Sequence, residues 1–209
     1  NFVSAALLKY YMADRIIYIG TVRSMWDVVY DTFVPNPSVE IWEQLSTQSN
    51  DWNHKTPLSD ASYINEVFEN TIITPILVKY GINTEENEEN IKVLFGLQKL
   101  LNDGDELYVD VSHGFRSLPL VLTNVINFII ENLKMNISIK NISYGMFEVS
   151  SEMDGITPIV NLNIVQELQQ TIKASHEFKE YGNAFLFSSL LTDADKSLST
   201  LLLDFSNTK

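Results

Sequence analysis

The 209-residue chain contains no cysteine, only three arginines and no apolar run long enough to cross a membrane. Without cysteine it can form neither disulfides nor thiolate metal sites, and this composition fits a reducing compartment. The longest apolar candidate, residues 118–130, is interrupted by Thr123, Asn124 and Asn127, which argues against a membrane-spanning helix. Because no signal-peptide pattern is visible either, we expect a cytoplasmic protein that does not bind membranes.

Positive charge is scarce, since 14 Lys and Arg residues face 27 Asp and Glu residues and the net charge is -13. A broad surface for duplex nucleic acid needs clustered Lys and Arg to displace counterions, so we expect no duplex partner. A small anion in a local pocket remains compatible with this charge. Arg23 and Arg116 each follow a predicted strand, which places two of the three arginines where ligands bind in open α/β sheets.

Three common catalytic signatures are absent from the sequence. It contains no Gly-x-Ser-x-Gly nucleophile motif, no Gly-x4-Gly-Lys-Ser/Thr phosphate loop, and no arginine followed four to six residues later by histidine. His54, His113 and His176 are widely separated, so they do not form a zinc-binding pattern. We therefore expect no metal and no cofactor.

Short apolar runs alternate with helical patterns, which predicts an α/β fold with a Rossmann-like, mainly parallel sheet and helices on both faces. Strands are expected at 15–20, 71–79, 106–111, 137–149 and 156–162. Helices are expected at 1–11, 26–33, 91–101, 118–133, 164–178 and, after a break at 181–183, at 184–205, with a further helical turn or two at 60–69. We expect the third strand to be buried on both faces, residues 83–90 to be an acidic, solvated segment, and residues 34–57 to be an irregular insertion with a helix at 39–45. The chain opens on a helix where a doubly wound sheet usually opens on a strand, so the first strand is expected to be missing.

The most informative segment is the turn between the third strand and the long apolar helix. Asp110 ends the strand, Pro119 lies in the first helical turn, and the residues between them include Ser112, His113, Gly114, Arg116 and Ser117. Gly114 allows a ligand close to the backbone, Arg116 offers a planar fork for phosphate oxygens, and Ser117 is the expected N-cap. Free N–H groups at a helix N-terminus attract anions, so this turn predicts a phosphate-binding site.

His113 can stack on a base, donate to a phosphate or shuttle a proton, or it can brace the turn by bonding to a backbone carbonyl. We favour ligand contact because a glycine and an arginine lie beside it. A nucleophilic Ser112–His113 pair is disfavoured, since neighbouring residues on a strand point to opposite faces.

Two further loops are candidates for the same site. After the first predicted strand, Thr21 and Ser24 offer hydroxyls, Arg23 a charge and Trp26 a stacking plane for a base; the alternative is an ordinary loop above a core tryptophan. After the fourth predicted strand come Gly145, which is either a ligand approach or a bulge, and Glu148, which is either a ligand contact or a solvated carboxylate.

These segments resemble a known family. The run Asp110-Val-Ser-His-Gly-Phe-Arg-Ser-Leu-Pro119 closely resembles the Asp-x-Thr/Ser-His-Gly-Phe-Arg-x-x-Pro signature of CRISPR-associated Rossmann-fold (CARF) domains. Ile19-Gly-Thr-x-x-Ser-x-Trp26, Tyr144-Gly-x-x-Glu148 and Glu180-Tyr-Gly182 also fit the family's pattern. The resemblance spans nearly the whole chain; the missing first strand, with its glycine-containing loop, departs from it and leaves one wall of the expected pocket unaccounted for.

The resemblance implies an allosteric sensor of type III CRISPR antiviral defence. Such domains form two-fold homodimers and bind a cyclic oligoadenylate across the dimer interface, here expected to be the tetra- or hexa-adenylate. Binding switches on an attached effector, often a HEPN ribonuclease. Residues 1–163 would form the CARF ligand-binding domain, and residues 164–209 a helical extension or linker toward the effector.

Carried over by position, Arg116 and the N–H groups near Ser117 would hold phosphates, while His113 and the loop 21–26 would face adenines or ribose. The full expected ligand set is Thr21, Arg23, Ser24, Trp26, Ser112, His113, Gly114, Phe115, Arg116, Ser117, Gly145 and Glu148. Some relatives also cleave the ring slowly, and in that alternative His113 and Arg116 assist attack by a 2′-hydroxyl. Two other readings stay open: an enzyme acting on a small nucleotide, and a dimerisation module whose interface is the helix 118–133.

Overall fold

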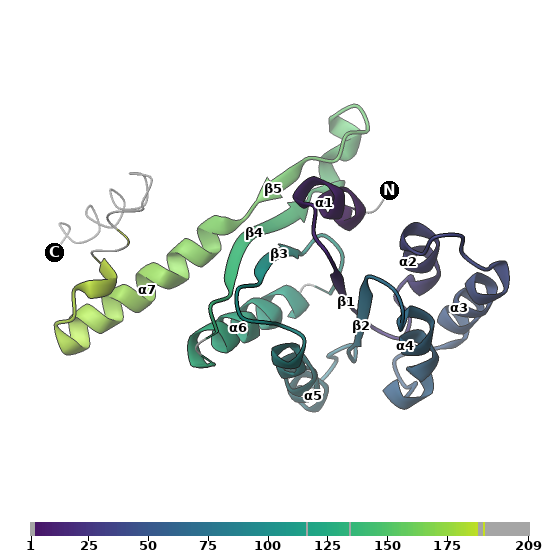
Figure 1. Cartoon of the computed structure of the whole chain (residues 1–209), viewed down its shortest axis with the longest axis horizontal. Coiled ribbons are helices and arrows are strands. Elements are labelled where there is room, and N and C mark those ends of the chain that lie inside the picture. Colours follow the sequence, from purple (N-terminus) through teal and green to yellow (C-terminus); the bar gives the residue numbers. More distant parts are fainter. Residues whose placement is uncertain (1–2, 116, 134, 188–189, 191–209) are drawn as a thin grey trace. The chain divides into compact units, whose positions relative to one another are not determined.

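The computed structural model describes residues 3–115, 117–133, 135–187 and 190. The chain divides into two compact units, residues 1–160 and residues 161–209. The first unit carries the sheets and their covering helices, and the second carries the last long helix (Figure 1).

The elements of the first unit alternate between helices and strands, as the sequence pattern predicts. The helices are α1 (Val3–Tyr11), α2 (Trp26–Phe33), α3 (Val39–Asp51), α4 (Ser62–Phe68), α5 (Thr84–Phe95) and α6 (Ser117–Asn132), with short 3-10 helices η1 (Leu58–Ala61), η2 (Gly96–Lys99) and η3 (Phe147–Glu152). The strands are β1 (Ile16–Gly20), β2 (Ile73–Leu77), β3 (Glu106–Asp110) and β4 (Ser138–Gly145), and β5 (Ile159–Asn161) runs across the boundary to the second unit.

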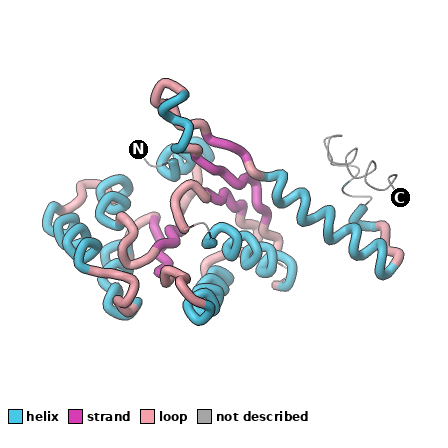
Figure 2. The backbone as a smooth tube through the Cα atoms, turned by 180° about the vertical axis from the view of Figure 1, so that it is seen from behind, coloured by secondary structure: helices cyan, strands magenta, loops and turns pink. Residues whose placement is uncertain are grey.

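The strands form two sheets, which Figure 2 shows as two separate groups. In the first sheet β1 and β2 pair in parallel, with Ile16 opposite Ile73 and Gly20 opposite Leu77. In the second sheet β3 pairs in parallel with β4, and β5 lies on the other side of β4. Parallel pairing brings the carboxyl ends of paired strands to the same edge, so the predicted Rossmann-like arrangement is confirmed.

Side-chain alternation along β2 separates two hydrophobic cores. Ile73 and Leu77 face a first core, which is completed by α2, α3 and α4 and contains the buried Trp26 and Phe68. Ile76 and Val78 belong to a second core, which is built with α5, α6 and partly buried residues of β1, β3 and β4. Successive residues of a strand point to opposite faces, so helices cover both faces of the β1–β2 sheet, as expected.

The prediction that β3 is buried on both faces is wrong. Tyr108, at its centre, is 37% exposed, and its ring stacks on Tyr11 of α1 with 4.1 Å between ring centroids. Asn141 of β4 donates a hydrogen bond to the Tyr11 hydroxyl at 2.8 Å. An apolar run alone did not reveal that the face of β3 carrying Tyr108 is only partly covered, by the tyrosine-containing end of α1.

Two helices of the first unit extend further than the sequence pattern predicts. The helix expected at 39–45 continues to Asp51 as α3, and the residues expected to be solvated at 83–90 are mostly the first two turns of α5. The Asn83 side chain caps α5 by accepting from the Glu86 N–H at 2.8 Å, and the acidic first turn favours the positive end of the helix dipole. The α-helix ends at Phe95, and η2 follows it.

The second unit is dominated by α7 (Asn163–Tyr181). Gly182 ends this helix with a left-handed φ of 67°, and its N–H donates to the Phe178 carbonyl at 2.9 Å, which confirms the predicted break at residues 181–183. Most of the further helix expected at 184–205 lies outside the described residues. Among the helices that the structure describes, none is both long and apolar enough to cross a bilayer.

Candidate ligand-binding site

The turn between β3 and α6 is fixed to the end of β4 by one serine. Asp110 Oδ1 accepts hydrogen bonds from the Ser112 N–H at 2.9 Å and from the Ser112 hydroxyl. The same hydroxyl oxygen accepts from the backbone N–H of Gly145 at 2.7 Å. Ser112 is therefore a brace between two strand ends rather than a freely exposed ligand contact.

Gly145 is buried at the point where three segments meet. A Cβ built at this position would lie 2.7 Å from Cγ2 of Val3 and 3.1 Å from Oγ of Ser112, so no larger residue fits without a shift. Position 145 is therefore a glycine because α1 and the β3–α6 turn pack closely against it, and not because the strand bulges there. The space that a side chain at position 145 would enter is therefore occupied by protein atoms.

The α6 N-terminus opens to solvent. Ser117 is the first residue of the helix, so the prediction that it is the N-cap is wrong; the position before it is Arg116, which lies outside the described residues. The Leu118 N–H donates to the Phe115 carbonyl at 2.9 Å, and Pro119 lies in the first turn as predicted. His113, Gly114, Phe115 and Ser117 are all exposed, which leaves the helix end open to an anion.

The segment after β4 lies beside this turn. The His113 ring is 4.9 Å from the Phe147 ring, centroid to centroid, and the Tyr144 hydroxyl donates to Glu148 Oε1 at 2.6 Å. The structure therefore brings Ser112 and His113 of this turn together with Gly145 and Phe147, as their positions at strand ends predict.

The loop after β1 corrects part of the expected site. Trp26 is only 1% exposed, packs in the first core and donates from Nε1 to the Thr21 carbonyl at 2.8 Å, so it offers no face to a base. Thr21 is buried, and its N–H donates to Ser24 Oγ at 2.9 Å. Arg23 is exposed, but its Nε donates to the Ser49 carbonyl at 3.1 Å. The loop therefore mainly covers the first core, which is the alternative that the sequence left open.

Tyr18 of β1 interacts electrostatically with Asp110 at the end of β3. Burial raises the pKa of the Tyr18 hydroxyl, a hydrogen bond with Ser4 lowers it, and the Asp110 carboxylate raises it further. Tyr18 in β1 and Asp110 at the end of β3 are therefore close enough to interact, and Ser4 of α1 is a hydrogen-bond partner of Tyr18.

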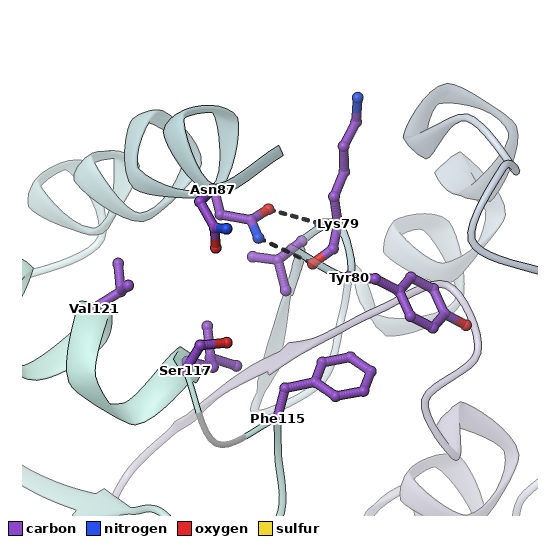
Figure 3. Close-up of a pocket in the computed structure, with 9 residues that line it drawn as sticks. Lys79, Tyr80, Asn87, Phe115, Ser117 and Val121 are labelled. Atoms are coloured by element: carbon purple, nitrogen blue, oxygen red, sulfur yellow. Dashed lines mark hydrogen bonds between the residues drawn. The ribbon is translucent and has the colours of Figure 1, made fainter. Parts of the chain in front are cut away.

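A small pocket between α5, the end of β2 and the start of α6 was not predicted (Figure 3). Its cavity volume is about 10 Å³, and its lining includes Lys79, Tyr80, Asn87, Asn90, Phe115 and Ser117. The available signal was an aromatic residue and a glycine, Tyr80-Gly81, directly after a strand. The described residues contain no group of three His, Asp or Glu side chains placed to hold a metal ion.

Comparison with known proteins gives two matches. Residues 1–148 match the family described as "CRISPR system endoribonuclease Csx1, CARF domain". The chain is 31% identical over 218 residues to "CRISPR-associated protein MJ1674" of Methanocaldococcus jannaschii, across 96% of this chain and 34% of that protein. The chain thus spans about a third of the length of this relative. With its parallel strand pairs β1–β2 and β3–β4 and the strand-end turn that carries the family's signature, the chain belongs to the CARF-domain family of the CRISPR endoribonuclease Csx1.

Proposed function

We propose that this chain is a cyclic oligoadenylate sensor domain that regulates an attached effector in type III CRISPR antiviral defence. The observation that carries the proposal is the open N-terminus of α6, reached by a turn that Ser112 braces between Asp110 and Gly145. Membership of the CARF family supports a role in CRISPR defence.

The chemistry of the turn suits a phosphate ligand. The first N–H groups of a helix lack intrahelical partners and carry the positive end of the helix dipole, so an anion is favoured there. The sequence adds the Arg116 guanidinium one residue before the helix. Because the chain carries a net charge of -13, such a local site, rather than a broad basic surface, is what attracts the ligand.

A homodimer fits both the ligand and α6. A ring of identical nucleotides has rotational symmetry, and a two-fold dimer presents the same turn to it twice. On α6, Leu120 is 69% exposed and Phe128 is 51% exposed, and their spacing of eight residues places both on one helix face. We propose that this face contributes to the dimer contact, and that the regulated effector is a ribonuclease, as the name of the matched family indicates.

Calorimetry with cyclic tri-, tetra- and hexa-adenylate tests the proposal. We expect tight binding of one ring size by the wild-type protein and at least a tenfold loss in Arg116→Ala, since hydrogen bonds to charged groups contribute about 1.5–3 kcal/mol. Arg15→Ala is the matched control, because Arg15 is an exposed arginine paired with Asp105 at 2.7 Å, before the amino ends of β1 and β3. A dimer that binds none of the rings would contradict the sensor and favour a dimerisation module.

Ring cleavage at the same site is the second candidate, because His113 is exposed beside the helix end. In this reaction a ribose 2′-hydroxyl of the ring attacks the adjacent phosphorus, the P–O5′ bond breaks, and a 2′,3′-cyclic phosphate and a 5′-hydroxyl form. His113 would take or return a proton, and Arg116 would stabilise the phosphate charge. Labelled cyclic tetra-adenylate should yield linear product that is lost in His113→Ala; no product after hours of incubation would exclude cleavage.

A further inference from the structure

Side chains of α5 fix the backbone on both sides of Tyr80. Asn90 Oδ1 accepts from the Lys79 N–H at 2.7 Å, and Asn90 Nδ2 donates to the Lys79 carbonyl at 3.0 Å. On the other side, Glu86 Oε2 accepts from the Gly81 N–H at 2.9 Å, and Asn87 Nδ2 donates to the Gly81 carbonyl at 3.1 Å. The chain beyond β2 is therefore held in place although no strand continues there.

The side chain that this segment presents is not used by the hydrophobic cores. Tyr80 is half-buried and belongs to neither core cluster. Within the part of the chain that the structure describes, its hydroxyl has no hydrogen-bond partner. Its ring lies 5.3 Å from the ring of Phe115 at an interplanar angle of 39°, and Phe115 is itself 44% exposed. A backbone segment held by four side-chain hydrogen bonds thus places Tyr80 beside Phe115 at the surface.

The pair lies next to the anion-binding end of α6. Figure 3 shows the Tyr80 and Phe115 rings beside the pocket that Ser117 also lines, with the Tyr80 hydroxyl directed away from Asn87 and Ser117. Phe115 and Ser117 are two residues apart, which an extended chain covers in at most about 7 Å, a length comparable with one nucleotide. A base on the aromatic pair and its phosphate at the helix end can therefore belong to the same nucleotide.

We propose that Tyr80 and Phe115 form a base-stacking platform for an adenine of the bound nucleotide, with α5 residues Glu86, Asn87 and Asn90 as positioning residues. This inference rests on the proposed function and adds Tyr80, which follows strand β2, to the site. The neighbouring pocket, about 10 Å³, is too small to enclose a base, so the base lies over the rings rather than inside a cavity. Stacking on an aromatic face held in advance avoids the ordering cost that a mobile side chain would add.

Calorimetry with cyclic tetra-adenylate and with the uridylate ring of equal size and charge tests the platform in three variants. Tyr80→Ala and Tyr80→Leu remove the aromatic face, and Leu keeps apolar bulk, whereas Tyr80→Phe keeps the face. For Tyr80→Ala and Tyr80→Leu we expect about a 5- to 150-fold weaker affinity for the adenylate ring and a smaller preference for adenine over uracil. For Tyr80→Phe we expect the affinity to change within about twofold. The control is Tyr181→Ala, because Tyr181 is an exposed tyrosine in the second unit.

The outcomes separate the platform from the sensor. If wild type binds the adenylate ring and Tyr80→Leu binds it equally well with unchanged base preference, the platform is overturned and the sensor stands. If Tyr80→Leu restores the affinity that Tyr80→Ala loses, Tyr80 is only a packing residue, which also overturns the platform. If wild type binds no cyclic oligoadenylate of any size, both proposals are contradicted. Equal melting temperatures of the variants would show that altered affinities do not come from unfolding.

Discussion

Replacing Ser112 with alanine removes the brace between β3 and β4, and we expect it to destabilise the first unit measurably. The hydroxyl of Ser112 donates to Asp110 and accepts from the Gly145 N–H at 2.7 Å. In the variant the Asp110 carboxylate keeps its bond from the Ser112 backbone N–H, at 2.9 Å in the wild type. The Gly145 N–H has no such substitute, and Gly145 is buried.

The expected cost follows from these contacts. A buried donor left without a partner costs about 1–3 kcal/mol, and the lost bond to Asp110 adds about 1 kcal/mol. We therefore expect the free energy of unfolding to fall by about 2–4 kcal/mol, which corresponds to a melting temperature lower by about 4–16 °C for a unit of this size. Urea denaturation and differential scanning calorimetry measure the two quantities.

Ser150→Ala is the matched control. The Ser150 hydroxyl donates to the Phe147 carbonyl at 2.8 Å, but this bond is exposed, so water replaces it and the change should stay within about 0.5 kcal/mol. If Ser112→Ala also costs less than about 0.5 kcal/mol, water reaches the Gly145 N–H and the brace is not structural. A large loss of ring affinity with unchanged stability would instead make Ser112 a direct ligand contact.

Three further predictions address Trp26 in the first core, the Asn90 side chain that holds the backbone after β2, and Tyr18. Trp26→Ala should lower the free energy of unfolding by about 3–5 kcal/mol in urea denaturation, and a loss below about 1 kcal/mol would contradict its core role. Asn90→Leu leaves the Lys79 N–H without its acceptor, so the hydrogen-exchange protection of that amide should fall at least tenfold; unchanged protection would show that the amide has another partner. Because the native state raises the pKa of Tyr18 above 10.0, it retains a proton that the unfolded chain releases. Stability should therefore drop as the pH rises above 10.0, and Tyr18→Phe should reduce that drop; an identical pH dependence in the variant would refute the assignment.

Local sequence signals were sufficient for the order of elements. The bounds predicted for α2, residues 26–33, match the structure because its apolar residues repeat at helical spacing and a proline follows at Pro35. The start of α5 could also have been predicted, since Asn83 followed by Glu85 and Glu86 is a capping pattern. The acidic composition of residues 83–90 is equally typical of a solvated loop, so composition alone favoured the wrong assignment.

The site was harder to predict because it depends on contacts between distant segments. Whether Trp26 faces a ligand or the core is decided by Phe68, whose ring lies 6.1 Å away and 42 positions further along the sequence. Tyr80 gains its position from side chains of α5 and its neighbour from the β3–α6 turn. Sequence motifs describe residues that are close along the chain, whereas these contacts join residues that are distant along it.

The division of the first unit into two cores has a consequence for spectroscopy. Trp26 and Trp52 belong to or pack against the first core, the remaining tryptophan, Trp42, lies on α3, and the second core contains no tryptophan. Tryptophan emission therefore follows the first core, which is covered by α2, α3 and α4, whereas far-ultraviolet circular dichroism follows the helices of the whole chain. Coincident transitions would show that the two cores unfold as one cooperative unit, and separated transitions would show which core opens first.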